Sequence, residues 1–404
     1  MTSLVIISLC VLVLVAYLFD ITSSYTKIPS VILLLALGWA VKKAVVYYNI
    51  IPPDLSKILP MLGTIGLILI VLEGSLELEL NASKIPLVKK SLAISFFPMI
   101  IMACGGAFIL TVMYDCSYRE ALANLIPLCI ISSSLAIPSA KQFPVFFKEF
   151  ITYESSLSDI LGLVFFNFII ANETYTAAAF GNFFLQILII ILVSFIATAL
   201  LSFLLSRIAH DIKFVPIILL VILIYEISKI YNLPSLVFIL IFGLFLGNLD
   251  ELKHIKWLQK IKPYALNKEA HKFLGFTMEI TFLMKALFFL LFGFLINTED
   301  LLNTNSIAIS AIITLTIFII RALQLKLAKL PVKPLLFVAP RGLINILLFL
   351  SIPASLSIPV INSSVLIQVI ILTALIMMAG TLSAGKKTAV QKQQNDINET
   401  APEP

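Results

Sequence analysis

Long apolar runs constrain this chain more than any other feature of its sequence. A helix needs about 20 apolar residues to cross the hydrocarbon core of a bilayer, and the chain divides at its polar residues into thirteen segments of roughly this kind. Of its 404 residues, 60% are hydrophobic and 12% are charged, against about a quarter charged in soluble domains. The sequence therefore predicts an all-α, polytopic membrane protein, whose spans lie near 3–19, 28–41, 58–76, 91–114, 120–140, 150–172, 179–206, 213–230, 234–249, 273–296, 305–325, 334–352 and 364–384.

The distribution of Lys and Arg predicts the orientation of these spans, because cytoplasmic loops carry an excess of both residues. With the C-terminus inside, the inside loops and tail hold 20 of the 28 basic residues, and the outside loops hold five. We therefore expect the N-terminus outside and the C-terminus in the cytoplasm. The net charge of +6 then belongs to the loops and requires no nucleic-acid partner. The outside residues are Lys42, Lys43, Lys57, Arg119 and Lys229.

Two short patterns recur in the same order in the two halves of the chain. IPSVILLLALG, which ends at Gly38, matches LPSLVFILIFG, which ends at Gly243. LEGSLELEL, which begins at Leu72, matches LFGFLINTEDL, which begins at Leu291. Short apolar motifs also recur by chance, but the paired spacings indicate that spans 1–6 and 8–13 are repeats. Because one repeat and its connector make seven spans, the second copy is predicted to be inverted, as in many transporters.

The fifth span of each repeat is predicted to be broken. Span five carries Pro127 and Pro138 around a run of three serines, and span twelve carries Pro340, Arg341 and Gly342. Proline and glycine inside a span free backbone groups that neighbours or a bound ion must satisfy. A simple proline kink is the alternative, but the symmetric placement favours two broken helices that cross near the membrane midplane.

Two carboxylates lie inside the sixth span, FITYESSLSDILGLVFFNFIIAN. Charges inside a bilayer are costly and usually face a cavity, a partner or an ion path. At about 100° per residue, Ser155 and Asp159 lie on one face with Ser158 nearby, whereas Glu154 points elsewhere. This face offers oxygen ligands for a small cation. The alternative is an interfacial Glu154 and a purely structural Asp159.

Three basic residues fall inside spans, and two of them have a simple interpretation. We expect Arg341, at the break in span twelve, to form a structural ion pair with Glu154, because an unpaired buried charge is prohibitively costly. Arg321 lies near the end of its span and is expected to extend its side chain to the interface.

Lys285 is the third, and it lies in the middle of its span. Its candidate partners are Asp159, Glu73 and Glu279, and a purely structural ammonium is the alternative. Glu73 itself closes the apolar run of span three, so it lies either at the interface or in the site.

The motifs around these charges resemble those of the monovalent cation:proton antiporters, most closely the family of sodium/proton exchangers. That family reads G-E-S-L-L-N-D in span six and L-R-G-A-V-S-L in span twelve, where this chain has YESSLSD at 153–159 and PRGLINI at 340–346. In span ten it reads F-L-x-N-x-L-x-F-L-L-x-G, here FLMKALFFLLFG at 282–293, and in span three an acidic residue precedes glycine, here Glu73 and Gly74. The resemblance covers about residues 1–385.

The resemblance implies roles for these residues. Asp159 would carry the cation and the proton, Glu73 and Ser155 would help to ligate the cation, and Glu154 with Arg341 would form a buried ion pair. It also implies a homodimer and an elevator movement of a core domain. We expect core helices near 120–172 and 305–352, panel helices near 1–50 and 179–249, and a short cytoplasmic tail at 386–404.

The sequence departs from the family at three places. The T-D-P of span five is missing, and its place falls in SSSLAIP at 132–138, so hydroxyls such as that of Ser134 must replace an aspartate as ligands. Ser158 replaces the asparagine before the key aspartate, and Lys285 replaces a neutral residue. These departures leave cation preference and stoichiometry open.

We therefore expect a secondary antiporter, not an enzyme, that exchanges a monovalent cation for protons without a cofactor. Na+ is the expected cation, with Li+ and K+ as alternatives, and membrane lipid surrounds the protein. One carrying carboxylate makes one-for-one exchange the default, whereas release of a proton from Lys285 on cation binding would make exchange electrogenic. The compact size favours a bacterial inner membrane.

Two other functions stay open at this point. One is a sodium-coupled transporter of a small organic anion with a similar inverted-repeat fold, in which Arg341 and Lys285 would serve the anion. The other is a non-transporting membrane sensor, although the polar tail of 19 residues leaves no room for a regulatory domain. An intramembrane enzyme is disfavoured, because all three histidines fall in predicted loops: His210, His254 and His271.

Overall fold

The computed structural model describes residues 2–26, 28–48, 55, 57–78, 82–140, 143–207, 212–231, 233–249 and 263–399, and all regular structure among them is helical. Two of the loop histidines and six of the predicted inside basic residues lie outside the described residues: His210, His254, Lys27, Lys141, Lys253, Lys256, Lys260 and Lys262.

Ten of the helices are long. They are α1 (Thr2–Thr26), α2 (Ser30–Tyr47), α3 (Ile58–Glu77), α4 (Ile85–Met113), α7 (Val145–Ala171), α8 (Ala177–Arg207), α9 (Phe214–Ile230), α11 (Pro263–Leu295), α13 (Thr304–Leu327) and α16 (Ser363–Glu399). The shorter ones are α5 (Tyr118–Cys129), α6 (Ser133–Ala140), α10 (Leu236–Gly247), α12 (Thr298–Leu301), α14 (Val332–Leu335) and α15 (Leu343–Leu350). Two 3-10 turns lie at Ala82–Lys84 and Ala354–Leu356.

The prediction of a multi-pass membrane protein is confirmed. Among the described residues, ten helical segments are long and apolar enough to cross a membrane, and one of them combines α5 and α6. The other three predicted spans coincide with α9, which has 17 residues, with α10, which has 12, and with the interrupted pair α14 and α15. The count of thirteen spans stays a prediction, because these three are shorter than a regular spanning helix or broken.

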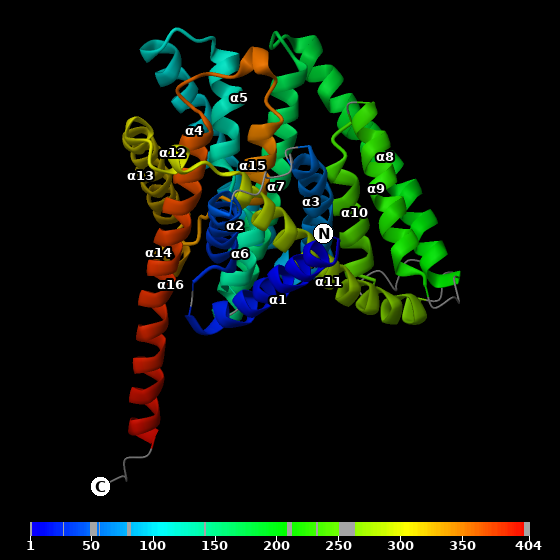
Figure 1. Cartoon of the computed structure of the whole chain (residues 1–404). Helices are drawn as coiled ribbons and strands as arrows, with labels where there is room; N and C mark the ends of the chain where they lie inside the picture. The colour runs from blue at the N-terminus through cyan, green and yellow to red at the C-terminus, as the bar shows by residue number, and fades with distance from the viewer. Residues whose placement is uncertain are drawn as a thin grey trace.

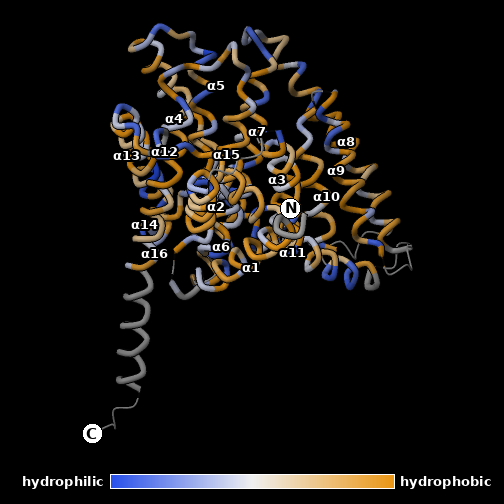
Figure 2. The backbone as a smooth tube through the Cα atoms, in the orientation of Figure 1, coloured by the Kyte–Doolittle hydropathy of each residue, from blue (hydrophilic) through white to orange (hydrophobic). Residues whose placement is uncertain are grey.

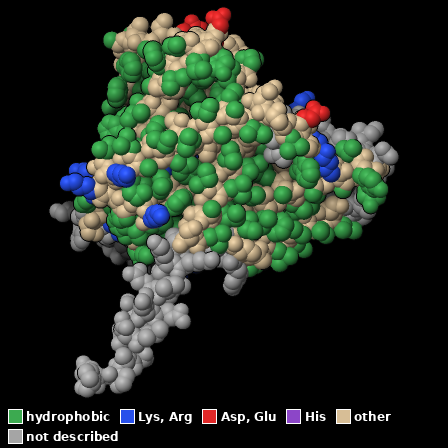
Figure 3. Space-filling view, turned by 90° about the vertical axis from the view of Figure 1, so that its left-hand side faces the viewer, with side chains coloured by type: hydrophobic (Ala, Val, Ile, Leu, Met, Phe, Trp, Pro, Cys, Tyr) green, Lys and Arg blue, Asp and Glu red, His purple; other side chains and the backbone are tan. Residues whose placement is uncertain are grey.

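The helices form one broad bundle, from which the C-terminal part of α16 projects (Figure 1). In that view α8 and α9 run along one side, α13 and α16 lie on the other, and α1 crosses the lower end obliquely. Hydrophobic residues dominate the whole height of the described helices, and hydrophilic ones gather mainly toward the two ends (Figure 2). On the face in Figure 3 the charged side chains are few, and hydrophobic side chains are spread over the whole height of the described surface. An apolar exterior of this kind suits contact with lipid.

Local signals set the helix ends that matter for the interior. The hydroxyl of Ser117 accepts from the backbone N–H of Glu120, and the Glu120 carboxylate accepts from the N–H of Ser117 at 2.9 Å. This capping box satisfies two free donors and begins α5 at Tyr118. Arg119, in the first turn of α5, donates to the carbonyl oxygens of Ile169 and Ile170 at the end of α7. The start of α5 is thereby tied to the end of α7.

Two close crossings join the halves of the chain. A Cβ on Gly38 of α2 would overlap the carbonyl oxygen of Leu290 in α11, and a Cβ on Gly243 of α10 would overlap the side chain of Ser75 in α3. Glycine permits this approach because it has no Cβ. Each helix that carries the first recurring pattern therefore packs against the helix that carries the second pattern of the other half.

Candidate functional site

Two interrupted helical segments meet in the buried interior. Helix α5 ends at Cys129 and α6 begins at Ser133, with extended backbone at Ile130 between them. The second interruption runs from the end of α14 to the start of α15 at Leu343. The two breaks touch directly, because the N–H of Ser132 donates to the carbonyl oxygen of Pro340 at 2.9 Å. The second interruption includes the predicted Pro340, Arg341 and Gly342. The first lies between Pro127 and Pro138, but these prolines are themselves within α5 and α6.

Side chains of the second break satisfy the backbone groups that the first break frees. Arg341 donates to the carbonyl oxygens of Leu128 and Cys129, at 2.9 and 3.2 Å, and to that of Ala339 at 2.7 Å. Asn345 donates to two more carbonyls of the α5 end, at 2.6 and 2.9 Å. The positive guanidinium also lies at the negative C-terminal end of α5, which is electrostatically favourable. Arg341 thus holds the broken helix.

The predicted ion pair between Glu154 and Arg341 is wrong. Glu154 of α7 pairs with Arg321 of α13 through two bonds, Nη1 to Oε1 at 2.6 Å and Nη2 to Oε2 at 3.0 Å. The side chains are 1% and 4% exposed, so the expectation that Arg321 reaches the interface is wrong as well. Arg321 also donates from Nε to the carbonyl oxygen of Leu335 at 2.8 Å.

Arg341 and Arg321 bind different acceptors, and this explains why Glu154 pairs with Arg321. Arg341 finds carbonyl acceptors at the end of a broken helix, so it does not require a carboxylate. Arg321 is turned inward from α13, and its planar fork matches the carboxylate of Glu154 with two parallel bonds. Its position near the end of a span did not reveal the direction in which the side chain points.

Asp159 lies against the start of α6 and is 2% exposed. Its Oδ2 accepts from the backbone N–H of Ser133 at 3.3 Å and from the hydroxyl of the same residue. Its Oδ1 is buried and has no hydrogen-bond partner. No Lys, Arg or His in the described part of the chain forms an ion pair with it. One oxygen is therefore held by the helix terminus, and the other is available to a ligand.

Three of the four other predicted ligands are serines, and their hydroxyl groups have different hydrogen-bond partners. Ser155 lies one turn earlier on α7, and its hydroxyl donates to a helix carbonyl at 2.8 Å, which leaves its oxygen free to ligate. The oxygen of Ser158 accepts from the N–H of Ile131 at 3.0 Å, so this residue helps to stabilise the first break. Ser134 pairs its hydroxyl with that of Ser132 at 2.9 Å.

Glu73, the fourth of the other predicted ligands, lies on α3 and faces Lys285 of α11. Its Oε2 lies 4.0 Å from Nζ of Lys285 on α11, and the two side chains are 20% and 21% exposed. Of the three partners that the sequence allowed for Lys285, this is the one at ion-pair distance among the described residues. Because the pair is long and partly exposed, it contributes far less than the buried pair of Glu154.

Three contacts of the interior were not predicted from the sequence. They are the pairing of Arg321, the bonds from Asn345 to the α5 end, and the contact of Ser133 with Asp159. A signal existed for Asn345, since it is the one polar residue in the apolar run LINILLFL. Ser133 differs from its serine neighbours only in being the first residue of α6, and that position is a property of the tertiary structure.

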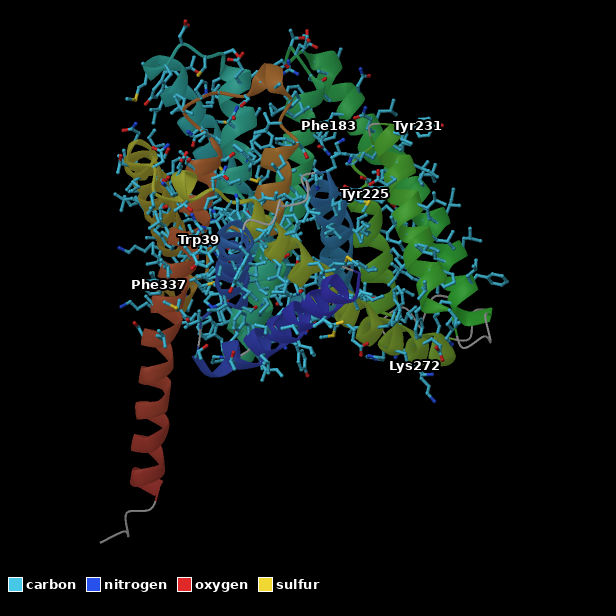
Figure 4. All side chains as sticks on the ribbon, viewed as in Figure 1. Trp39, Phe183, Tyr225, Tyr231, Lys272 and Phe337 are labelled. Atoms are coloured by element: carbon cyan, nitrogen blue, oxygen red, sulfur yellow. The ribbon has the colours of Figure 1, made fainter. Side chains whose placement is uncertain are left out.

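A cavity of about 540 Å³ lies beside α7 and is lined by residues of α3, α7, α8, α9 and α15. It includes Leu163, which is one helical turn from Asp159. Phe183 and Tyr225 also line it and are labelled in the upper part of Figure 4. Several of its other lining residues are polar: Asn167, Asn172, Gln186, Lys229 and Ser235. The cavity thus begins about one helical turn from Asp159, and its polar residues on α7, Asn167 and Asn172, lie further toward the end of that helix.

Comparison with known proteins agrees with this architecture. The family described as sodium/hydrogen exchanger, transmembrane, matches residues 10–384. No curated protein matches the chain. The fold is similar to that of the sodium proton antiporter MjNhaP1 from Methanocaldococcus jannaschii. Its structure at pH 8 has 18% identity and a TM-score of 0.70, over 94% of this chain and 99% of that one. Its electron microscopy structure has 19% identity and a TM-score of 0.67, over 100% of both chains.

Proposed function

The chain belongs to the sodium/hydrogen exchanger family, and on this premise we propose that it is a secondary antiporter that exchanges a monovalent cation for protons. Na+ is the expected cation, with Li+ and K+ as the alternatives to be tested. The observation that carries the proposal is the buried Oδ1 of Asp159, which has no partner. A carboxylate in an apolar interior requires a counter-charge, and either a proton or a cation supplies it.

The mechanism follows from competition at this one carboxylate. Ser133 holds Oδ2 and orients the group, so that Oδ1 receives the exchanged ion. Ser155 adds a hydroxyl oxygen from the same face of α7, and Glu73 adds a carboxylate from α3. Since proton and cation bind the same oxygen, each displaces the other. Ser134 and Ser158 are assigned to the broken helix and not to the ion.

The topology proposed for this function has thirteen spans in two inverted repeats, with the N-terminus outside and the C-terminus inside. Two observations support the repeats: the matching glycine crossings of α2 with α11 and of α10 with α3, and the direct contact of the two breaks. The excess of Lys and Arg in the predicted inside loops supports the orientation. A bacterial inner membrane is the proposed location.

An elevator movement is proposed for access from the two sides. The moving core would comprise helices near 120–172 and 305–352, and the panel, through which a homodimer forms, would comprise helices near 1–50 and 179–249. The cavity beside α7 supports this division, because its lining comes from both groups. It lies toward the end of α7 that is predicted to face outside, so it would admit water and cations from that side.

Stoichiometry depends on Lys285. With Asp159 as the single carrier, one cation is exchanged for one proton. If a cation at Glu73 displaces the ammonium and Lys285 then loses its own proton, the exchange carries net charge. The distance of 4.0 Å between these two side chains makes Glu73, and not Asp159, the group through which Lys285 would act.

The proposal is tested by flux in proteoliposomes that contain a pH dye. Addition of Na+, Li+ or K+ is expected to drive proton movement in the native chain, and Asp159→Asn is expected to abolish it because an amide cannot exchange a proton for a cation. Cation-driven proton movement that persists in Asp159→Asn would refute the assignment. Flux that requires an added organic anion would instead favour the anion transporter, although Arg341 already has three carbonyl acceptors.

A further inference from the structure

Ser156 is a further serine next to Asp159, and its hydroxyl has no hydrogen-bond partner. Ser156 of α7 is 7% exposed, and its hydroxyl oxygen is buried without a hydrogen-bond partner. Serine in a helix commonly donates to the carbonyl one turn earlier, as Ser155 does here. We propose that the hydroxyl of Ser156 is a further ligand of the transported cation and helps to determine which cation the site prefers. This inference rests on the proposed antiport function.

The position of Ser156 on α7 matches that role. Residues three and four apart are neighbours on a helix surface, so Ser156 and Ser155 both lie next to Asp159. Two buried oxygens without partners, Oδ1 of Asp159 and Oγ of Ser156, therefore lie on adjacent positions of one helix face. An ion between them satisfies both oxygens at once.

Helix α3 packs against α7 at Ser156. A Cβ on Gly74 would lie 3.2 Å from Oγ of Ser156 and 3.8 Å from the Ile137 side chain of α6. Gly74 directly follows Glu73, so the hydroxyl faces the short stretch of α3 that supplies the second carboxylate. Ser156 thus lies where α7 packs against α3, beside the residue that follows Glu73.

The chemistry of the ligand set explains why an additional hydroxyl matters in this chain. Small hard cations prefer oxygen ligands, and the stretch at 132–138 has serines where the family has an aspartate. Of these serines, Ser133 and Ser134 are already engaged in hydrogen bonds. The family motif has leucine at the position of Ser156. The chain therefore has no carboxylate at 132–138 in span five and has an additional hydroxyl in span six.

The test compares Ser156→Ala and Ser156→Cys with a matched control. Ser202→Ala is suitable, because Ser202 of α8 is also buried and its hydroxyl also lacks a partner. The full chain in proteoliposomes is assayed for flux with Na+, Li+, K+ and Tl+. Binding of the same cations to the purified protein is measured in parallel by calorimetry, so that the result does not depend on transport.

Loss of one oxygen ligand is expected to raise the half-saturating Na+ concentration of Ser156→Ala about tenfold, which is about 1.4 kcal/mol. Ser156→Cys is expected to lose Na+ affinity but retain Tl+ affinity, because sulfur is a soft ligand. A packing role alone would not change the order of the cations. Ser202→Ala is expected to match the native chain.

The inference is overturned if Ser156→Ala binds and transports Na+ within a factor of about two of the native chain, or if Ser156→Cys leaves the Na+ to Tl+ ratio unchanged. These outcomes are distinct from failure of the antiport proposal. Failure of the antiport proposal would appear as proton movement that Asp159→Asn does not affect, or as the absence of flux in the native chain. In the second case calorimetry still measures whether Ser156→Ala weakens cation binding.

Discussion

The pairing of Glu154 with Arg321, and not with Arg341, can be measured as an interaction energy. Arg321→Gln removes two charge-assisted bonds of 2.6 and 3.0 Å and leaves a carboxylate that is 1% exposed without its counter-charge. Breaking a buried pair from one side costs about 3–5 kcal/mol. Glu154→Gln is expected to cost a similar amount, because it leaves the guanidinium buried. The double variant restores a neutral pair and recovers much of the loss.

The double-mutant cycle for Glu154 and Arg321 should therefore show a coupling of about 2–4 kcal/mol. The matched cycle uses Arg341→Gln. This variant also loses stability, because three carbonyl oxygens lose their donor, but it shares no hydrogen bond with Glu154. Its coupling to Glu154 is expected to be about 0.5 kcal/mol or less.

Unfolding by SDS in mixed micelles provides the free energies for both cycles. Arg321→Lys serves where Arg321→Gln does not fold, since it keeps the charge but loses the bidentate geometry. A coupling of Glu154 to Arg341 that equals or exceeds its coupling to Arg321 would refute the pairing and the reasoning that led to it.

Two further outcomes are expected. Lys285→Gln should lower the half-saturating cation concentration about fivefold in the flux assay, because the ammonium no longer competes with the cation at Glu73. The factor follows from the free energy of a partly exposed ion pair, which is about 1 kcal/mol at most. An unchanged or higher half-saturating concentration would contradict this. Gly38→Ala should reduce stability in the SDS titration by about 1–3 kcal/mol, because its Cβ overlaps α11. Gly105→Ala, which meets nothing within 4 Å, should leave it unchanged or higher, and equal losses would show that the close crossing is unimportant.

The parts of the fold that the sequence could predict are those that depend on local pattern. Apolar runs of spanning length identify the helices of a membrane protein. Pro-Arg-Gly within span twelve locates one break, because this pattern cannot continue a helical hydrogen-bond ladder. The two prolines of span five only bracket the other break, since Pro127 lies within α5 and Pro138 within α6. The helical period alone places Ser155 next to Asp159. These inferences need no knowledge of which helices pack together.

Contacts between distant helices could not be predicted in the same way. Glu154 and Arg321 are 167 positions apart, and several pairings of the buried charges satisfy electroneutrality equally well. Only packing decides that α13 turns Arg321 toward α7 while Arg341 lies at the end of α5. The same holds for Lys285, whose choice of Glu73 depends on the neighbouring positions of α11 and α3.

The sequence by itself therefore determined that this chain crosses a membrane, which two of its spans are broken and which face of the sixth span carries a buried carboxylate. Each of these follows from the spacing of residues along one helix. The tertiary structure decided which charges neutralise one another, which serine holds Asp159 and that the hydroxyl of Ser156 is left without a partner. These are distances between separate helices, and the free energy that selects them comes from packing the whole bundle.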